Sequence, residues 1–129
     1  MTEHRQEIAT DGAPRAIGPY SQGVSVGRWV FTAGQLGADP ETGELEDTIE
    51  KQTQRALDNI EAILAERGGD WAHVVKTTVF LNDLADYNAF NAVYAELVEE
   101  PFPARSAVQV ADLPKGALVE IEAVAHVPK

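Results

Sequence analysis

The sequence predicts an α+β domain of two layers, in which two helices cover one face of a six-stranded, mostly antiparallel sheet. Two long segments carry apolar residues at helical spacing, and six shorter segments have the composition or alternation of strands. Their order is β-β-β-α-β-α-β-β. Neither a repeat nor a linker rich in Pro, Gly or Ser divides the chain, so residues 1–129 are expected to form one domain.

Three short strands are expected before the first helix. They cover residues 3–9, 24–26 and 29–32. Pro14, Gly18 and Pro19 force an irregular loop between the first two strands, and the last two are joined by a turn at Gly27. The segment 39–43, Asp-Pro-Glu-Thr-Gly, predicts another turn, because Pro presets one backbone dihedral and Gly supplies a positive one.

The first helix has the clearest pattern. Its mostly apolar stripe advances by three or four residues at a time through Ile49, Thr53, Ala56, Ile60, Ile63 and Arg67. This spacing places the stripe on one helical face. Thr48 or Asp47 is expected to cap the start of the helix, and Gly68-Gly69 is expected to end it.

The second half of the chain predicts a strand, a helix and two more strands. Residues 74–81 are rich in β-branched side chains, which is typical of a buried strand. The stripe of the second helix consists of Tyr87, Phe90, Tyr94 and Leu97. Pro101 and Pro103 are expected to stop this helix. Residues 105–110 and 117–127 then form two strands on either side of a turn at 113–116.

The last two strands direct charged side chains to particular faces of the sheet. The residues of the last strand that alternate toward the helices are Val119, Ile121, Ala123, Ala125 and Val127. Glu120 and Glu122 therefore face the other way, onto a face that would be bare in a monomer and that oligomerisation is expected to cover. In the strand before, Arg105, Ala107 and Gln109 share one side. An arginine and a glutamate from neighbouring strands can then meet at a subunit interface.

Composition argues against several classes of function. The 21 Asp and Glu residues outnumber the 10 Lys and Arg residues, and the resulting net charge of −11 repels phosphate backbones, so nucleic-acid binding is not expected. The chain has no cysteine, which fits a cytoplasmic location. No apolar run reaches the length of a membrane helix, and the polar start lacks a signal-peptide core. The three histidines show no ligand spacing, so no metal site is expected.

Seven segments of the chain form a recognisable series. They are 18–22 (Gly-Pro-Tyr-Ser-Gln), 32–35 (Thr-Ala-Gly-Gln), 39–43, 75–81 (Val-Lys-Thr-Thr-Val-Phe-Leu), 91–94, 102–106 (Phe-Pro-Ala-Arg-Ser) and 113–122. With these segments in this order, the chain from about residue 8 to residue 127 resembles the Rid (YjgF-type) family of 2-iminoacid deaminases. Any one segment is a weak signal, whereas seven with compatible spacing are a strong one.

The resemblance implies a fold and an activity. The fold is chorismate-mutase-like, and the assembly is a homotrimer with three active-site clefts between subunits. The activity is hydrolysis of 2-aminoacrylate and 2-aminocrotonate, in their imine forms, to pyruvate or 2-oxobutanoate and ammonia. These reactive species escape from pyridoxal-phosphate dehydratases, and the deaminase itself needs no cofactor.

Two charged residues are the candidates for catalysis. Arg105 carries a planar, permanently charged fork that matches a carboxylate bidentately, so it is expected to bind the acid end of the substrate. The alternative is a structural ion pair, for instance with Glu122. Glu120 can accept a proton or orient the attacking water. Alternation alone leaves Glu122 open as the working carboxylate, and the resemblance favours Glu120.

Four further residues are candidates for substrate binding. The phenol of Tyr20 can close the cleft, the amide of Asn91 can contact the site, and Gly34 permits close approach of its backbone N–H. Ala107 lies near Arg105 at a position where many family members have cysteine. Ala33 is a second departure, because a serine often precedes the glycine there. Both alanines make the expected pocket larger and less polar.

Two other readings remain open from the sequence. A chorismate-mutase-type enzyme can share this fold, but a dianionic substrate usually requires more than one basic group, and only Arg105 is well placed. The other is a non-catalytic ligand-binding or regulatory protein of Rid type. Arg105 together with Glu120 argues against it.

Overall fold

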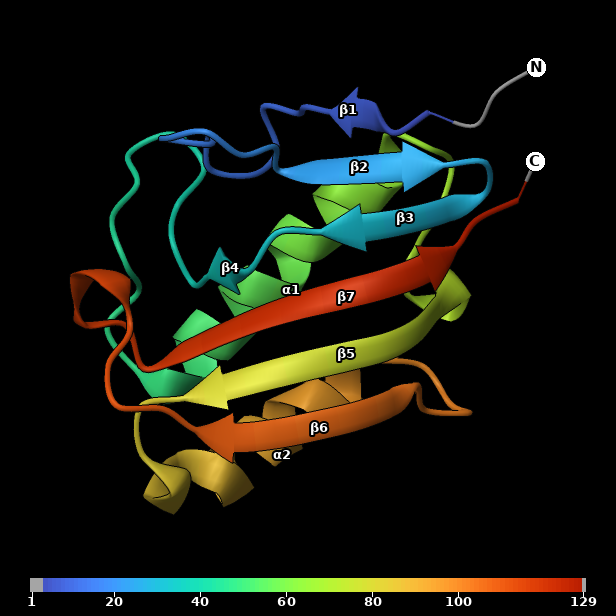
Figure 1. The fold of residues 1–129 in the computed structure, drawn as a ribbon. Helices are drawn as coiled ribbons and strands as arrows, with labels where there is room; N and C mark the ends of the chain where they lie inside the picture. Colours follow the sequence, from blue (N-terminus) through green and yellow to red (C-terminus); the bar gives the residue numbers. More distant parts are fainter. Residues whose placement is uncertain (1–3, 129) are drawn as a thin grey trace.

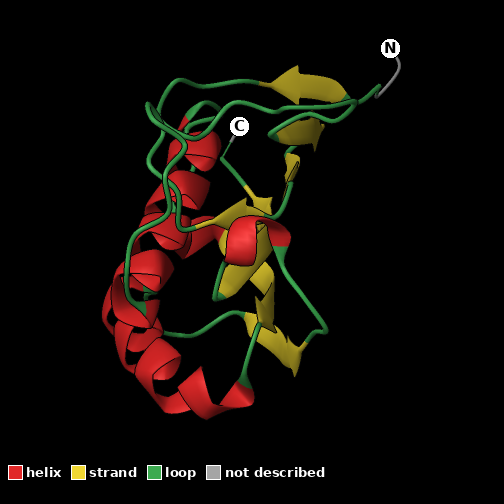
Figure 2. Cartoon of the chain, turned by 90° about the vertical axis from the view of Figure 1, so that its left-hand side faces the viewer, coloured by secondary structure: helices red, strands yellow, loops and turns green. Residues whose placement is uncertain are grey.

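The computed structural model describes residues 4–128, which form two helices and a seven-stranded sheet. The strands are β1 (Gln6–Ile8), β2 (Gly23–Val26), β3 (Trp29–Thr32), β4 (Gln35–Leu36), β5 (Val74–Leu81), β6 (Ala104–Gln109) and β7 (Val119–His126), and the helices are α1 (Ile49–Ala65) and α2 (Tyr87–Leu97). Three single-turn 3-10 helices are η1 (Trp71–His73), η2 (Leu84–Asp86) and η3 (Pro114–Gly116). Both helices lie on the same side of the sheet (Figures 1 and 2), which confirms the predicted two-layer α+β architecture.

The sheet has the strand order β1-β2-β3-β7-β5-β6, with β4 paired to β7 beyond the end of β3 (Figure 1). Neighbouring strands are antiparallel except β5 and β6, which are parallel because α2 carries the chain back between them. The prediction of a mostly antiparallel sheet is therefore confirmed. The predicted six strands become seven, because the two residues of β4 are too short to show a strand pattern. Of the first predicted strand, 3–9, only 6–8 pair, and Glu3 lies outside the described residues.

A break separates β3 from β4 along the edge of β7. Phe31 of β3 pairs with Val124, and Gln35 of β4 pairs with Ile121. Between these two pairs the β3–β4 segment advances by four residues, whereas β7 advances by only three. The β3–β4 segment therefore contains one extra residue. Such a bulge bends the strand and redirects side chains. The gap is partly closed by the Thr32 hydroxyl, which accepts a hydrogen bond from the backbone N–H of Ala123.

Helix α1 begins where the sequence predicts and ends slightly earlier. The Thr48 hydroxyl accepts a hydrogen bond from the N–H of Lys51 and so caps the start. The helix ends before Gly68, whose φ of 74° is favourable for glycine. Arg67, predicted as the last position of the buried stripe, lies beyond the helix. Its guanidinium donates to the carbonyl of Glu7 and to the Ser25 hydroxyl, which ties the helix end to β1 and β2.

The core lies between the helices and the sheet. The five residues of β7 and its C-terminal extension predicted to face the helices are all buried, as are Phe90 and Tyr94 of α2. Tyr87, predicted to belong to the same stripe, is instead 37% exposed. The opposite face of the sheet exposes Trp29 and Phe31, 44% and 43% accessible, in agreement with a face that is bare in a single chain. Within residues 4–128 no helix is long and apolar enough to cross a membrane.

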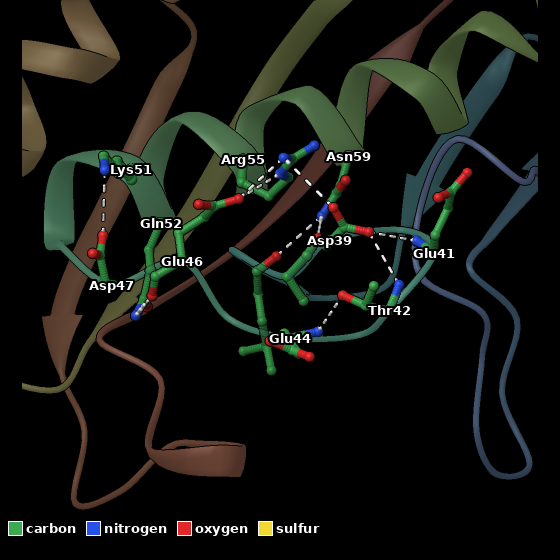
Figure 3. A network of polar contacts seen from close by, with 12 residues as sticks. Asp39, Glu41, Thr42, Glu44, Glu46, Asp47, Lys51, Gln52, Arg55 and Asn59 are labelled. Carbon is green, nitrogen blue, oxygen red and sulfur yellow. Dashed lines mark hydrogen bonds and ion pairs between the residues drawn. The ribbon is translucent and has the colours of Figure 1, made fainter.

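Polar side chains on α1 hold the 36–48 loop against the helix (Figure 3). Asn59, which is 1% exposed, donates to the carbonyls of Leu36 and Ala38. Gln52 donates to the carbonyl of Glu46, and Arg55 forms an ion pair of 3.0 Å with the Glu46 carboxylate. The sequence predicted only the apolar stripe of α1, and these buried amides give the helix a second face that shapes the loop.

Replacing Asn59 with alanine should lower the free energy of unfolding by about 1–3 kcal/mol, because two carbonyls lose their donor and at least one of them is buried. Chemical denaturation at a fixed protein concentration measures the change. Gln54→Ala, an exposed position on the same helix, is the control and should stay within about 0.5 kcal/mol of the parent chain. Equal stability of the two variants would show that Asn59 does not hold the loop.

Candidate active site

A cavity of roughly 840 Å³ opens at the break between β3 and β4. Its walls come from the 14–22 loop, the break itself, the 38–43 turn, the 114–115 turn and one residue of β7. Three of the residues predicted for the site line it, namely Tyr20, Gly34 and Glu120. They come from three separate parts of the chain, so the sheet topology is what brings them together.

Glu120 points away from the helices, as its position in β7 predicts, and lies directly over Gly34. A methyl group added to Gly34 would overlap the Glu120 carboxylate. Residue 34 therefore has to be glycine for this carboxylate to occupy its place. Glycine here makes room for Glu120, in addition to the close approach of its own backbone that the sequence suggests.

The environment of Glu120 suits proton transfer. Burial, and then the negative charge of Glu122, raise the pKa of the Glu120 carboxyl above its usual value. A carboxyl of this kind can exchange a proton closer to neutral pH than an ordinary surface glutamate. Glu122 is on the same face but is exposed and does not line the cavity. The geometry thus favours Glu120 over the alternative that alternation alone leaves open.

Tyr20 is positioned by a loop that one buried side chain organises. The Gln22 amide accepts a hydrogen bond from the N–H of Thr10 and donates to the carbonyls of Thr10, Ala13 and Pro14. The loop holds Tyr20 53% exposed at the cavity, with its hydroxyl 3.3 Å from the N–H of Ile17. Gln22 was missed as a site-building residue, although it lies in the Gly-Pro-Tyr-Ser-Gln segment.

Arg105 lies in a different part of the molecule, beside α2. Its guanidinium carbon is 4.8 Å from the ring centre of Tyr94, 5.3 Å from that of Phe90 and 5.6 Å from that of Tyr87. One of its terminal N–H groups donates to the Tyr87 hydroxyl at 3.0 Å. Cations are attracted to aromatic faces in this arrangement. Within residues 4–128 the guanidinium forms no ion pair, so the predicted alternative of a pair with Glu122 is wrong in the single chain.

Arg105 and Glu120 do not meet within one chain, and the expectation that their strands are neighbours is wrong. Strand β5 lies between β6 and β7. Arg105 pairs with Thr77, whose side chain is buried against Tyr94 of α2, so Arg105 is on the helix side. Glu120 pairs with Phe80 on the opposite face. The predicted site residues therefore form two groups on opposite faces of the sheet.

The remaining candidates belong to the group around Arg105. Asn91 lies one turn after Tyr87 on α2, and Ala107 packs against the apolar core from the same side of β6 as Arg105. Hydrogen bonding with Asn91, and then the charge of Arg105, lower the pKa of the Tyr87 phenol below its usual value. Tyr87 was interpreted only as part of a buried stripe. Its spacing of four residues from Asn91 was the signal that could have placed the two side chains together.

Comparison with known proteins identifies the family. The model of the family described as Endoribonuclease L-PSP, to which the Rid (YjgF-type) proteins belong, matches residues 10–127. The chain belongs to this family. The resemblance carried by the seven segments is thereby confirmed.

Several relatives are similar over nearly their whole length. A RutC family protein of Pyrococcus abyssi is 50% identical over 95% of this chain and 97% of its own. The human 2-iminobutanoate/2-iminopropanoate deaminase is 48% identical over 94% of this chain and 89% of its own. The crystal structure of RidA from an Antarctic Psychrobacter superimposes with a TM-score of 0.92 at 49% identity, covering 95% and 99% of the two chains. The α+β fold with two helices therefore matches that of Rid-family structures.

Replacing Glu120 with glutamine should stabilise the folded chain at pH 8. Ionisation of Glu120 is less favourable in the folded state than in the unfolded state, so the stability of the parent chain falls as pH rises through the raised pKa. Glutamine does not ionise, and the gain should disappear when the pH falls below the ordinary glutamate pKa. Denaturation curves at several pH values measure it.

The control for this prediction is Glu96→Gln on the exposed surface of α2, which removes the same charge without relieving burial. The oligomeric state is checked at each pH, because association also changes apparent stability. A gain at Glu120 no larger than at Glu96 would contradict the assignment of a desolvated carboxylate.

Proposed function

We propose that this chain hydrolyses reactive 2-imino acids, such as the imine forms of 2-aminoacrylate and 2-aminocrotonate, to 2-keto acids and ammonia. The two groups of site residues on opposite faces of the sheet are called half-sites. The observation that carries the proposal is that their functional side chains complement each other. One offers a carboxyl with a raised pKa in a cavity, and the other offers an arginine whose charge no carboxylate neutralises within residues 4–128. The deaminase names of close relatives support the same activity.

In this mechanism Arg105 binds the substrate carboxylate and fixes the position of the imine carbon. Glu120 accepts a proton from a water molecule as the water oxygen attacks that carbon. Glu120 returns this proton to the former imine nitrogen, which gives the neutral carbinolamine. The carbinolamine hydroxyl then gives up its proton to the nitrogen by way of Glu120, the C–N bond breaks with its electron pair leaving on ammonia, and the C=O bond of the keto acid forms. One imine and one water thus give one 2-keto acid and one ammonia, and the scheme uses no cofactor and no metal ion.

The two half-sites suggest how the active site is assembled. Because Glu120 and Arg105 lie on opposite faces of the sheet, a site that contains both takes them from different chains. We place the reaction in a homotrimer, in which the Tyr20–Gly34–Glu120 half-site of one subunit meets the Arg105–Asn91 half-site of the next. The exposed Trp29 and Phe31 supply apolar surface for this association.

The other candidates take supporting roles in the same cleft. In this scheme the Tyr20 phenol and the Gly34 N–H contact the reacting end of the substrate, and Asn91 acts beside Arg105. Ala33 lines the cavity without a hydroxyl. Ala107 packs into the apolar core and adds no polar group next to Arg105. The cysteine-free sequence suits a cytoplasmic setting.

Other functions fit the observations less well. The family description names an endoribonuclease, but a net charge of −11 opposes RNA binding. A chorismate-mutase-type reaction needs further cations for a second carboxylate, and Arg105 has none among its contacts within residues 4–128. A purely regulatory, ligand-binding role leaves the half-buried carboxyl of Glu120, with its raised pKa, without a purpose.

Arg105→Ala should lower deaminase activity by roughly 100-fold or more, because the substrate loses its carboxylate anchor. Glu120→Gln should lower it by about 100-fold through loss of the proton acceptor. The assay couples the protein to a serine or threonine dehydratase and follows keto-acid release while semicarbazide competes for the imine. Arg5→Ala, an exposed position, is the control and should keep parental activity. If the parent chain did not accelerate keto-acid release, the proposed deaminase activity would be refuted.

Mixing the two inactive variants tests the assembly. If each site takes Glu120 from one subunit and Arg105 from another, every trimer that contains both variants has one intact site of three, so these mixed trimers should regain about one third of the parental activity. The chains are co-expressed with different affinity tags, and the doubly tagged oligomers are assayed. If both residues of a site came from the same chain, neither variant would contain an intact site and mixing would restore nothing.

A further inference from the structure

Tyr87 is an exposed aromatic residue to which the proposed mechanism assigns no role. It is the first residue of α2. Its hydroxyl accepts a hydrogen bond of 3.0 Å from the terminal nitrogen of Arg105. This contact joins residues 18 positions apart and lies at the surface, where an arginine would otherwise sample many rotamers.

The aromatic rings around Arg105 hold the position of its guanidinium but do not fix the rotation of that group in its own plane. Contacts with the faces of Phe90 and Tyr94 hold the guanidinium near α2. A cation over a ring is not held at a particular rotation in its own plane, whereas a hydrogen bond from one N–H to a fixed oxygen sets that rotation. Among the hydrogen bonds within residues 4–128, the Tyr87 hydroxyl is the partner of the Arg105 side chain.

The neutral character of this partner matters in so acidic a protein. A carboxylate in the same place would orient Arg105 equally well, but it would also neutralise the charge that a substrate carboxylate must find. A phenol orients the guanidinium and leaves the charge and the remaining N–H groups available. Asn91 lies one turn further along α2, on the same side as Tyr87.

We propose that Tyr87 is a positioning residue, which orients the guanidinium of Arg105 for a substrate carboxylate through the hydrogen bond between the two side chains. This inference rests on the proposed function in taking a carboxylate as the ligand of Arg105. Tyr87 acts through Arg105, and its contribution should therefore vanish when the guanidinium is absent.

The test is a double-mutant cycle with Tyr87→Phe, Arg105→Lys and the double variant. Tyr87→Phe keeps the ring and removes only the hydroxyl. The probe is 2-oxobutanoate, whose binding to the purified oligomer is measured by calorimetry, together with kcat and KM in the coupled assay. We expect Tyr87→Phe to raise the Kd and the KM about five- to tenfold and to change kcat less. In the Arg105→Lys background the same substitution should change neither constant.

Asn88→Ala is the matched control, an exposed neighbour of Tyr87 on α2, and should bind 2-oxobutanoate as the parent chain does. Parental affinity in Tyr87→Phe would overturn the proposal. An equal loss in the parent chain and in the Arg105→Lys variant would overturn it too, because Tyr87 would then act independently of the guanidinium. An unfolding midpoint below that of the control would assign the loss to packing and also count against it.

The binding arm separates this inference from the proposed function. A parent chain that binds 2-oxobutanoate but accelerates no imine hydrolysis would refute the deaminase and leave Tyr87 to be judged on affinity alone. A parent chain that does not bind the keto acid would overturn the inference directly. Normal deaminase activity with no coupling between Tyr87 and Arg105 would refute the inference and leave the function standing.

Discussion

The double pairing of β7 is the constraint on which the rest of the structure depends. This strand pairs with β3 and β4 along one edge and with β5 along the other, so its register is held from both sides. Its period of two then divides its side chains strictly between the helical core and the opposite face. A slip of one residue would bury Glu120 and expose Ile121. The buried apolar set of β7 therefore also fixes the direction of the carboxylate.

The cavity follows from an irregularity next to this strand. The extra residue between β3 and β4 interrupts the ladder beside β7, and Gly34 at the interruption leaves space for the carboxylate of Glu120. The same enclosure desolvates that carboxylate, with Glu122 nearby, and raises its pKa. A regular strand with a side chain at residue 34 would fill the space and push Glu120 toward solvent. The close packing at Gly34 and the raised pKa of Glu120 therefore have a common cause.

The acidic surface and the Arg105 half-site have opposite effects on an anion. A net charge of −11 repels anions in general, yet the anionic substrate of the proposed reaction requires one cation that stays free. Aromatic faces and a neutral phenol surround Arg105, and these groups hold it without neutralising it. Under the proposed function, the separation of Arg105 from Glu120 makes catalysis depend on association, so a single chain would carry two halves of different sites.

Much of the fold was predictable because it follows from local patterns. Helical spacing placed α1 and α2, and alternation in β7 placed Glu120 on the face away from the helices. The family segments pointed to Arg105, Glu120, Tyr20 and Gly34 as candidates. Only the tertiary structure decided that β5 separates β6 from β7, that β4 exists, and that Tyr87 contacts Arg105. Periodicity determines which face a residue occupies, whereas strand neighbours and cross-element contacts arise from long-range pairing, which no local pattern encodes.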